Sequence, residues 1–266
     1  VATDRISAFD HILKNTITKK GEVLTKMSAF WFDLTKDLIP NHMISIDAKD
    51  MPEFFSSEEF IGKSTLCKKL TMIPIECIVR GYITGSGYES YKKNKTVCGI
   101  PLPDGLKDCS KLPTALFTPS TKAEIGDHDE NIDFDTCVKV CEKAFPGKGE
   151  KIANEIREKA LAVYNKCADY ALTKGIIIAD TKFEFGLDEN DNVILADEVL
   201  TPDSSRFWRL DGYEAGHSPP SFDKQFVRDW LKAHPDSNYD LPQDVIDKTI
   251  ALYKEAYHML TGQTIE

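Results

Sequence analysis

The segment from residue 175 to residue 206 constrains the fold of this chain more than any other part of the sequence. It opens with three consecutive isoleucines, Ile176 to Ile178, and such an apolar β-branched run without helical spacing predicts a buried strand. Asp180, Lys182 and Glu184 follow at intervals of two, so a strand places their side chains on one face. Phenylalanines alternate with them and would occupy the opposite face. We therefore expect a strand with one apolar face and one charged face.

A second strand is predicted to return antiparallel to the first. The polar residues 188–192 indicate a turn, and residues 193–199 are mostly apolar. If the turn centres on residues 190–191, Glu184 lies directly opposite Asp197. Two carboxylates so placed repel each other unless a cation lies between them, and Mg²⁺ carrying nucleotide phosphates suits such oxygen ligands. The alternative is a solvated face of salt bridges, but the apolar residues that flank the charges favour a metal–nucleotide site.

The composition excludes several classes of protein. A formal net charge of −10 argues against a nucleic-acid-binding protein, because such proteins carry broad basic surfaces. No apolar run reaches the length of a membrane span, and the seven cysteines are scattered without a C-x-x-C pair. These features predict a cytoplasmic protein with reduced cysteines that binds small molecules and contacts neither nucleic acid nor membranes. The sequence leaves open whether it is a monomer or a homo-oligomer.

The rest of the chain mixes predicted helices and strands, which indicates an α+β fold with a nucleotide cleft between two lobes. Apolar residues at helical spacing predict helices over residues 24–38, 134–145, 149–174, 222–233 and 242–261. Strands are expected at residues 44–46 and, as a joined pair, within residues 64–80, while loops are expected at residues 96–113 and 208–220.

Two further segments are candidates for ligand contacts. Residues 81–87 (GYITGSG) are rich in glycine, and the backbone N–H groups of such a segment can bind an anion. Arg80 precedes this segment and Ser86 lies within it, which favours a phosphate. Residues 117–132 are very polar, and long polar loops in compact proteins often carry function. An ordinary exposed loop is the alternative for this second segment.

Four segments together resemble one enzyme family: VRGYITGSG, FTPSTKAEIGDHDENI, GIIIADTKFEFG and ADEVLTPDSSRFW. They are similar to the phosphoribosylaminoimidazole-succinocarboxamide synthases, or SAICAR synthetases, and the likeness runs from Val1 to the last helix. The resemblance implies an ATP-dependent ligase that joins L-aspartate to the carboxylate of an aminoimidazole ribonucleotide (CAIR), with SAICAR, ADP and phosphate as products. It also implies a two-lobed α+β fold related to kinase and ATP-grasp architectures. Residues 1–78 would form the ATP-binding lobe and residues 79–266 the substrate- and metal-binding lobe.

The resemblance also implies roles for individual residues. Catalysis falls to Lys182, Lys122 and Asp180, and the metal ligands for Mg²⁺ are Glu184 and Asp197. The ATP-binding residues are Lys69, Met72, Glu76 and Glu184. The residues that bind the ribonucleotide and the incoming aspartate are Arg80, Ser86, His128, Asp129, Asp203 and Arg206, with Asp203 placed for the ribose hydroxyls.

The family pattern includes a Gly- and Lys-containing hairpin over the ATP phosphates ahead of the DRISAFD segment. We expect that hairpin to be missing from this sequence, which begins at Val1, rather than from the protein. Two other functions compete with the ligase: a small-molecule kinase and a nucleotide-binding regulatory module. The sequence lacks the H-R-D and D-F-G segments of protein kinases, and charged residues crowded into one cleft are unusual for a regulatory module.

Overall fold

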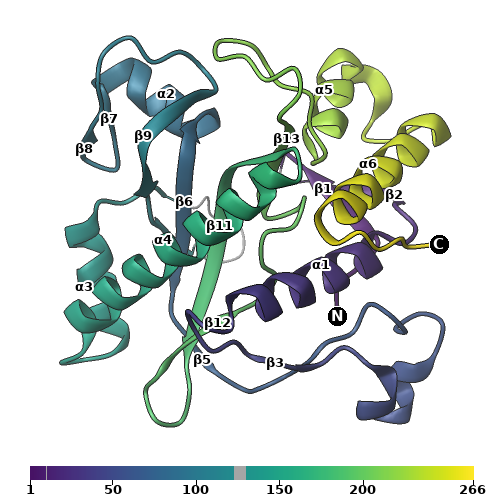
Figure 1. Cartoon of the computed structure of the whole chain (residues 1–266), viewed down its shortest axis with the longest axis horizontal. Helices are drawn as coiled ribbons and strands as arrows, with labels where there is room; N and C mark the ends of the chain where they lie inside the picture. Colours follow the sequence, from purple (N-terminus) through teal and green to yellow (C-terminus); the bar gives the residue numbers. More distant parts are fainter. Residues whose placement is uncertain (10, 123–129) are drawn as a thin grey trace.

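The computed structural model describes residues 1–9, 11–122 and 130–266. In this part of the chain, the strand β11 (Ile176–Leu187) is the central strand of a seven-stranded sheet. One edge of β11 pairs with β6 (Ile75–Ile83) and β5 (Thr71–Met72). The other edge pairs with β13 (Ser205–Arg209) and β12 (Val193–Ala196). Every one of these pairings is antiparallel: β12 and β13 follow β11 closely in the sequence, whereas β5 and β6 come from a distant, earlier part of the chain (Figure 1).

The remaining elements surround this sheet. The other strands are β1 (Arg5–Ala8), β2 (His11–Thr16), β3 (Met43–Ser45), β4 (Leu66–Cys67), β7 (Thr96–Val97), β8 (Ile100–Pro101), β9 (Ser110–Phe117) and β10 (Ser120–Thr121). The α-helices are α1 (Lys20–Thr35), α2 (Gly85–Asn94), α3 (Phe134–Ala144), α4 (Gly149–Thr173), α5 (Gln225–Ala233) and α6 (Gln243–Thr261). Short 3-10 helices are η1 (Ala48–Asp50), η2 (Glu53–Ser56) and η3 (Pro235–Ser237).

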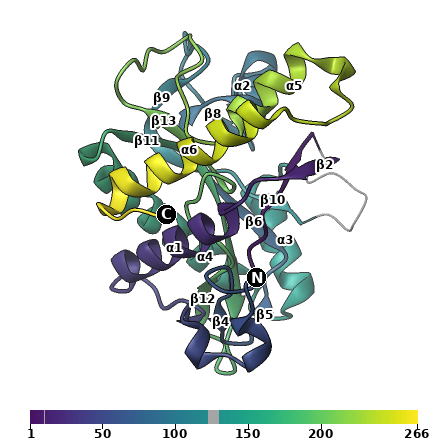
Figure 2. The same ribbon diagram turned by 90° about the vertical axis from the view of Figure 1, so that its right-hand side faces the viewer.

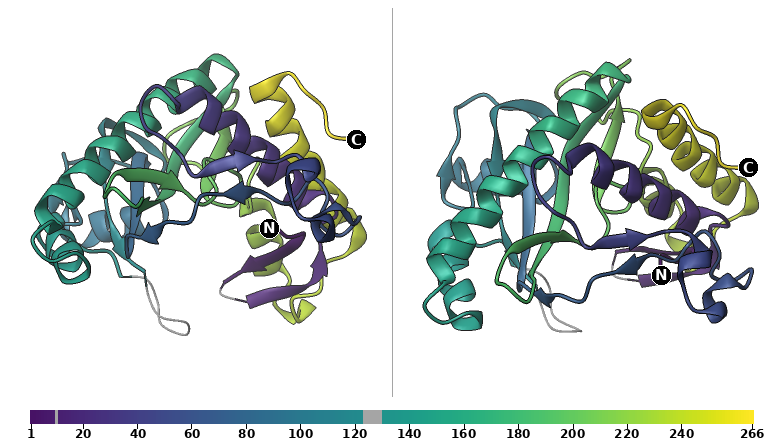
Figure 3. Two further views of the ribbon diagram at one scale, coloured as in Figure 1. Left: turned by 90° about the horizontal axis from the view of Figure 1, so that it is seen from below. Right: turned by 60° about the horizontal axis from the view of Figure 1, so that its bottom comes forward.

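Helices cover one face of the sheet. The apolar stripe of α4 packs on β11, where Phe183 and Phe185 are fully buried in the main core. Figure 3 shows α4, α1 and α6 side by side over this face, and Figure 2 shows α6 passing next to α1. Each fully buried phenylalanine stabilises the fold by about 1.5–3 kcal/mol. Because side chains alternate along a strand, this burial leaves Lys182 and Glu184 on the opposite face, as predicted.

The α+β class and the helices predicted from apolar spacing are confirmed, with ends that differ by a few residues. Several elements were not predicted, among them α2, β7, β8, β9 and β13. Residues 81–87, read from the sequence only as a glycine-rich segment, contain the end of β6 (residues 81–83) and the start of α2 at Gly85. Residues 96–113 contain β7, β8 and the start of β9 rather than a loop. The strands β7 and β8 hold two residues each and pair with each other, so they are too short for a periodic pattern, and α2 begins in the glycine-rich segment.

The predicted register of the hairpin was wrong by one residue. Glu184 pairs with Ala196, not with Asp197, and β12 ends at Ala196. The loop holds the five residues 188–192, and the Asp188 side chain accepts hydrogen bonds from the backbone N–H groups of Asn190 and Asn192, both at 2.9 Å. An odd loop centres on one residue instead of between two, which shifts every cross-strand partner by one.

The predicted division between lobes at residue 78 stays a prediction, and β6 runs continuously across it. Within the described ranges, no helix is both long and apolar enough to span a bilayer.

Candidate functional site

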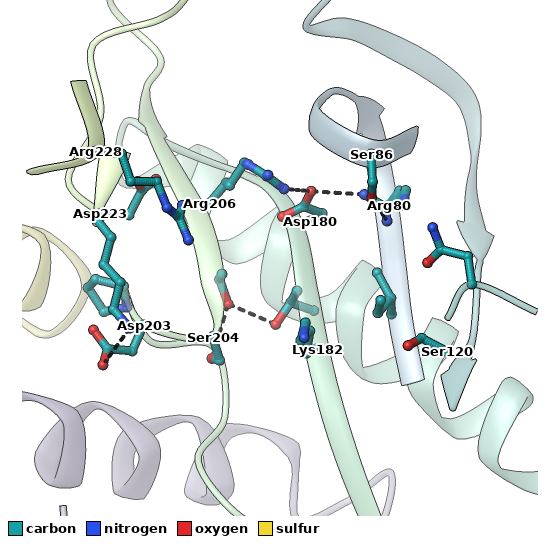
Figure 4. A pocket seen from close by; sticks show the side chains of 16 residues that line it. Arg80, Ser86, Ser120, Asp180, Lys182, Asp203, Ser204, Arg206, Asp223 and Arg228 are labelled. Carbon is teal, nitrogen blue, oxygen red and sulfur yellow. Dashed lines mark hydrogen bonds and ion pairs between the residues drawn. The ribbon is translucent and has the colours of Figure 1, made fainter. Parts of the chain in front are cut away.

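A polar cavity of about 270 Å³ opens where the charged face of β11 meets β6, β13 and the start of α2 (Figure 4). The predicted residues that line it are Arg80, Ser86, Asp180, Lys182, Asp203 and Arg206. These six residues come from five separate parts of the fold, and the sequence placed them together only through the family resemblance. Asp180 and Lys182 both line this cavity from β11, as their spacing of two residues predicted.

Asp180 lies between two arginines at the floor of the cavity. It pairs in register with Arg80 on β6 and with Arg206 on β13, because β11 is bordered by those strands on its two edges. The Arg80 guanidinium lies 3.3 Å from the Asp180 carboxylate, and Arg206 forms a closer ion pair with the same oxygen. Burial lowers the pKa of Arg80, whereas Asp180 raises the pKa of Arg206. Two cations that share one anion leave a net positive charge, which suits an anionic ligand.

Arg80 is held entirely by protein groups around it. Its Nε donates to Thr118 Oγ1 at 3.0 Å, and one terminal nitrogen donates to Ser86 Oγ at 3.2 Å. Arg206 is more open, with 29% of its side chain exposed. Arg80 therefore fixes the positions of Asp180 and Ser86, and Arg206 is the arginine better placed to contact a ligand.

The N-terminal end of α2 closes against Arg206. Gly85 has a φ of +55°, and a Cβ at this position would lie 2.5 Å from an Arg206 nitrogen. Glycine is required here both for the left-handed backbone and for this close approach. A helix N-terminus beside an arginine adds to the positive potential, so a phosphate is the ligand that this corner of the cavity favours.

Further along β11, lysines and carboxylates form two close pairs. Lys182 Nζ lies 2.6 Å from Glu76 Oε2, and Lys122 Nζ lies 2.7 Å from Glu184 Oε2. Both lysines are about half exposed, at 47% and 48% of their side-chain surface. Their partners Glu76 and Glu184 are only 14% and 20% exposed, so a ligand can reach each pair from the lysine side.

Asp197 lies near the Lys122–Glu184 pair although it does not face Glu184 across the ladder. It follows β12 in the left-handed conformation, with φ of 57°. Desolvation by the surrounding protein raises the pKa of Asp197, and the nearby Lys122 charge opposes that effect. The Asp197 side chain is still open to solvent, and two carboxylates with phosphate oxygens are a usual set for Mg²⁺. Among the described residues, no third acid, histidine or cysteine completes an all-protein metal cluster.

A second cavity, of about 360 Å³, adjoins the first. Asp197, Glu198 and Lys20 line it, and Asp203 lines both cavities. Burial, together with the neighbouring Asp203, raises the pKa of Glu198 to about 7. The wall between the two cavities is thus built around Asp203.

The other predicted site residues are less central. Lys69 and Met72 are exposed and line neither of the two cavities in the described structure. His128 and Asp129 lie outside the described residues. Lys224 and Arg228 line the first cavity but were not predicted, since residues 222–233 read only as an amphipathic closing helix. Their spacing of four residues, which puts two cations on one helix face, is the signal that could have found them.

Comparison with known proteins gives a consistent result along the chain. The family model described as SAICAR synthetase matches residues 1–243. The phosphoribosylaminoimidazole-succinocarboxamide synthase of Lachnospira eligens is 69% identical over 263 residues, which cover 99% of this chain and 89% of that protein. The enzyme of the same name from Pichia angusta is 50% identical over 275 residues, covering 99% of this chain and 88% of that protein.

Solved structures agree with the sequence matches. The SAICAR synthase from Saccharomyces cerevisiae in complex with SAICAR aligns with a TM-score of 0.89 at 45% identity, covering 100% of this chain and 89% of that chain. A SAICAR synthetase in complex with ADP aligns with a TM-score of 0.70 at 28% identity, covering 99% of this chain and 90% of that chain.

Proposed function

The chain belongs to the SAICAR synthetase family, and from that premise we propose which of its residues carry out the family's reaction. The reaction is the ATP-dependent ligation of L-aspartate to the carboxylate of 5-amino-1-(5-phospho-D-ribosyl)imidazole-4-carboxylate. Its products are SAICAR, ADP and phosphate, and it is a step of purine biosynthesis. The chain is therefore a carbon–nitrogen ligase, as the resemblance of its four segments predicted.

The ribonucleotide binds in the first cavity. The observation that carries this proposal is the pair of arginines on Asp180 beside the N-terminus of α2. Arg206, with Ser86 at the helix start, binds the 5′-phosphate, and Arg80 holds Ser86 in place. Asp203, on the opposite wall, accepts a hydrogen bond from a ribose hydroxyl. The imidazole carboxylate then lies toward Lys182.

ATP binds next to this cavity, along the edge marked by Lys69, Met72 and Glu76. Glu184 and Asp197 would hold Mg²⁺, since both carboxylates lie near Lys122 and carboxylate oxygens are the ligands that this ion prefers. When bound, that ion neutralises the charge on the phosphates. A cytoplasmic location remains a prediction.

Lysines on the charged face activate the carboxylate. A carboxylate oxygen attacks the γ-phosphorus, the bond to ADP breaks, and an acyl phosphate forms. The aspartate amine then attacks the acyl carbon, loses a proton, and displaces phosphate. Lys182 and Lys122 supply positive charge where negative charge develops in both steps, by turning from Glu76 and Glu184 toward the reacting oxygens. Asp180 holds the arginines that fix the substrate.

The ratio of ADP formed to SAICAR formed, in the presence of aspartate, tests this function. Incubated with ATP, Mg²⁺, the carboxylated ribonucleotide and L-aspartate, the enzyme is expected to form one ADP per SAICAR, measured by chromatography of both products. Brisk ADP formation without a coupled amide product would contradict the ligase and indicate a kinase.

Replacing Arg206 with Lys is expected to raise the KM for the ribonucleotide at least tenfold and to change the KM for ATP less than twofold. Lysine keeps the charge but loses the planar fork, and a hydrogen bond to a charged group is worth about 1.5–3 kcal/mol. Arg209→Lys is the matched control, because Arg209 lies on the same strand but pairs with Glu255 away from the cavity. A larger rise in the ATP constant would show that the two pockets are assigned the wrong way round.

A further inference from the structure

Asp203 is held from three directions by residues of three separate segments. Its Oδ2 accepts from Lys20 Nζ at 2.8 Å and from Lys224 Nζ at 3.1 Å, and its Oδ1 accepts from the Tyr253 hydroxyl at 2.8 Å. Lys20 is the first residue of α1, Lys224 directly precedes α5, and Tyr253 lies within α6. Figure 4 shows Asp203 at the wall of the first cavity, across from the arginines.

Lys20 occupies a costly position for a cation. Only 3% of its side chain is exposed, and it lies at the N-terminal end of a helix, where the helix dipole disfavours positive charge. Its Nζ also donates to the Thr3 carbonyl oxygen at 3.2 Å. The adjacent Lys19 is 47% exposed and pairs with Glu22. The start of this helix therefore does not by itself require a buried lysine. The Asp203 carboxylate is the group that makes burial of Lys20 favourable.

These contacts keep the Asp203 carboxylate ionised and occupy most of its hydrogen-bond acceptor positions. A carboxylate has about four acceptor positions, and three are taken by Lys20, Lys224 and Tyr253. Burial alone would raise the pKa of Asp203, but Lys224 and Lys20 outweigh it, so the pKa is lowered. One acceptor position remains on a side chain that lines the substrate cavity.

We infer that Lys20 and Tyr253 are positioning residues that fix the Asp203 carboxylate so that its remaining acceptor position receives one ribose hydroxyl of the ribonucleotide. The inference rests on the proposed binding of the ribose by Asp203. Lys20 acts from the N-terminal part of the chain and Tyr253 from the last helix. The residues that would select the ribose hydroxyl therefore lie in segments distant in sequence from the strands that line the cavity.

Calorimetric titration tests this with the carboxylated ribonucleotide and its 2′-deoxy and 3′-deoxy analogues, in the absence of aspartate and ATP. The wild-type enzyme is expected to bind the ribonucleotide about tenfold more tightly than one of the two analogues. Lys20→Met is expected to weaken binding of the ribonucleotide about tenfold and to reduce that preference to about twofold. Lys19→Met is the matched control and should keep the wild-type preference.

Tyr253→Phe removes only a hydroxyl, so it provides a second test if Lys20→Met does not fold by circular dichroism. It is expected to lower the preference for the ribose hydroxyl in the same direction. Folded variants that bind all three ligands more weakly but keep the tenfold preference would overturn the inference and leave the ribose contact of Asp203 intact. A wild-type enzyme with no preference would overturn that contact itself, and the inference with it.

Discussion

Replacing Glu184 with Gln, or Asp197 with Asn, is expected to lower kcat at least a hundredfold at limiting Mg²⁺ while the protein stays folded. Each change removes one anionic oxygen from the proposed Mg²⁺ site, and charge stabilisation by such an ion is worth several kcal/mol in the transition state. Stability should change little for Glu184→Gln, because its partner Lys122 is an exposed cation. Steady-state assays over a range of Mg²⁺ concentrations measure the effect.

Glu189→Gln is the control for this pair, since Glu189 is an exposed carboxylate in the loop of the same hairpin. It should retain wild-type turnover at every Mg²⁺ concentration. Wild-type turnover in both Glu184→Gln and Asp197→Asn would show that the ion binds elsewhere.

Replacing Asp180 with Asn is expected to lower the free energy of unfolding by about 3–5 kcal/mol, the usual cost of removing one partner from a buried ion pair. The change leaves Arg80 and Arg206 as neighbouring cations without a shared anion, and only 4% of the Arg80 side chain is exposed. Urea denaturation of the ligand-free enzyme measures the difference, and phosphate should restore part of the loss because it supplies the missing negative charge.

Asp191→Asn provides the comparison for stability. Asp191 pairs with Lys148, and both side chains are about half exposed, so this variant should lose no more than about 1 kcal/mol. Equal destabilisation of the two variants would mean that the Asp180 pairs are as solvated as a surface salt bridge.

The sequence predicted the elements whose pattern is local. Periodic apolar residues located α4 and α6, and strict alternation located the two faces of β11. The hairpin register was missed because it depends on loop length, and the Asp188 side chain that stabilises a five-residue loop has no signature distinct from other polar turns. The register was predicted one residue off, so Asp197 was placed opposite Glu184, although β12 ends at Ala196.

The site itself could be predicted only in part, because its geometry comes from pairings between distant strands. Arg80 and Asp180 are 100 residues apart, and nothing in either local segment specifies that β6 borders β11. The four family segments identified the enzyme without this information, and they named six of the residues in the cavity. Lys20 and Tyr253 lie on helices and Lys224 directly precedes one. The sequence of these helices indicates only packing, so the convergence of the three residues on Asp203 required the structure.

Transfer of oxygen from the imidazole carboxylate to phosphate tests the acyl-phosphate route most directly. The ribonucleotide is labelled with ¹⁸O in both carboxylate oxygens and converted in the presence of ATP, Mg²⁺ and L-aspartate, and the released phosphate is analysed by mass spectrometry. Attack of the carboxylate on the γ-phosphorus predicts one ¹⁸O atom in each phosphate and one in the new amide of SAICAR. SAICAR formed together with unlabelled phosphate would contradict an acyl phosphate and the catalytic roles proposed for Lys182 and Lys122.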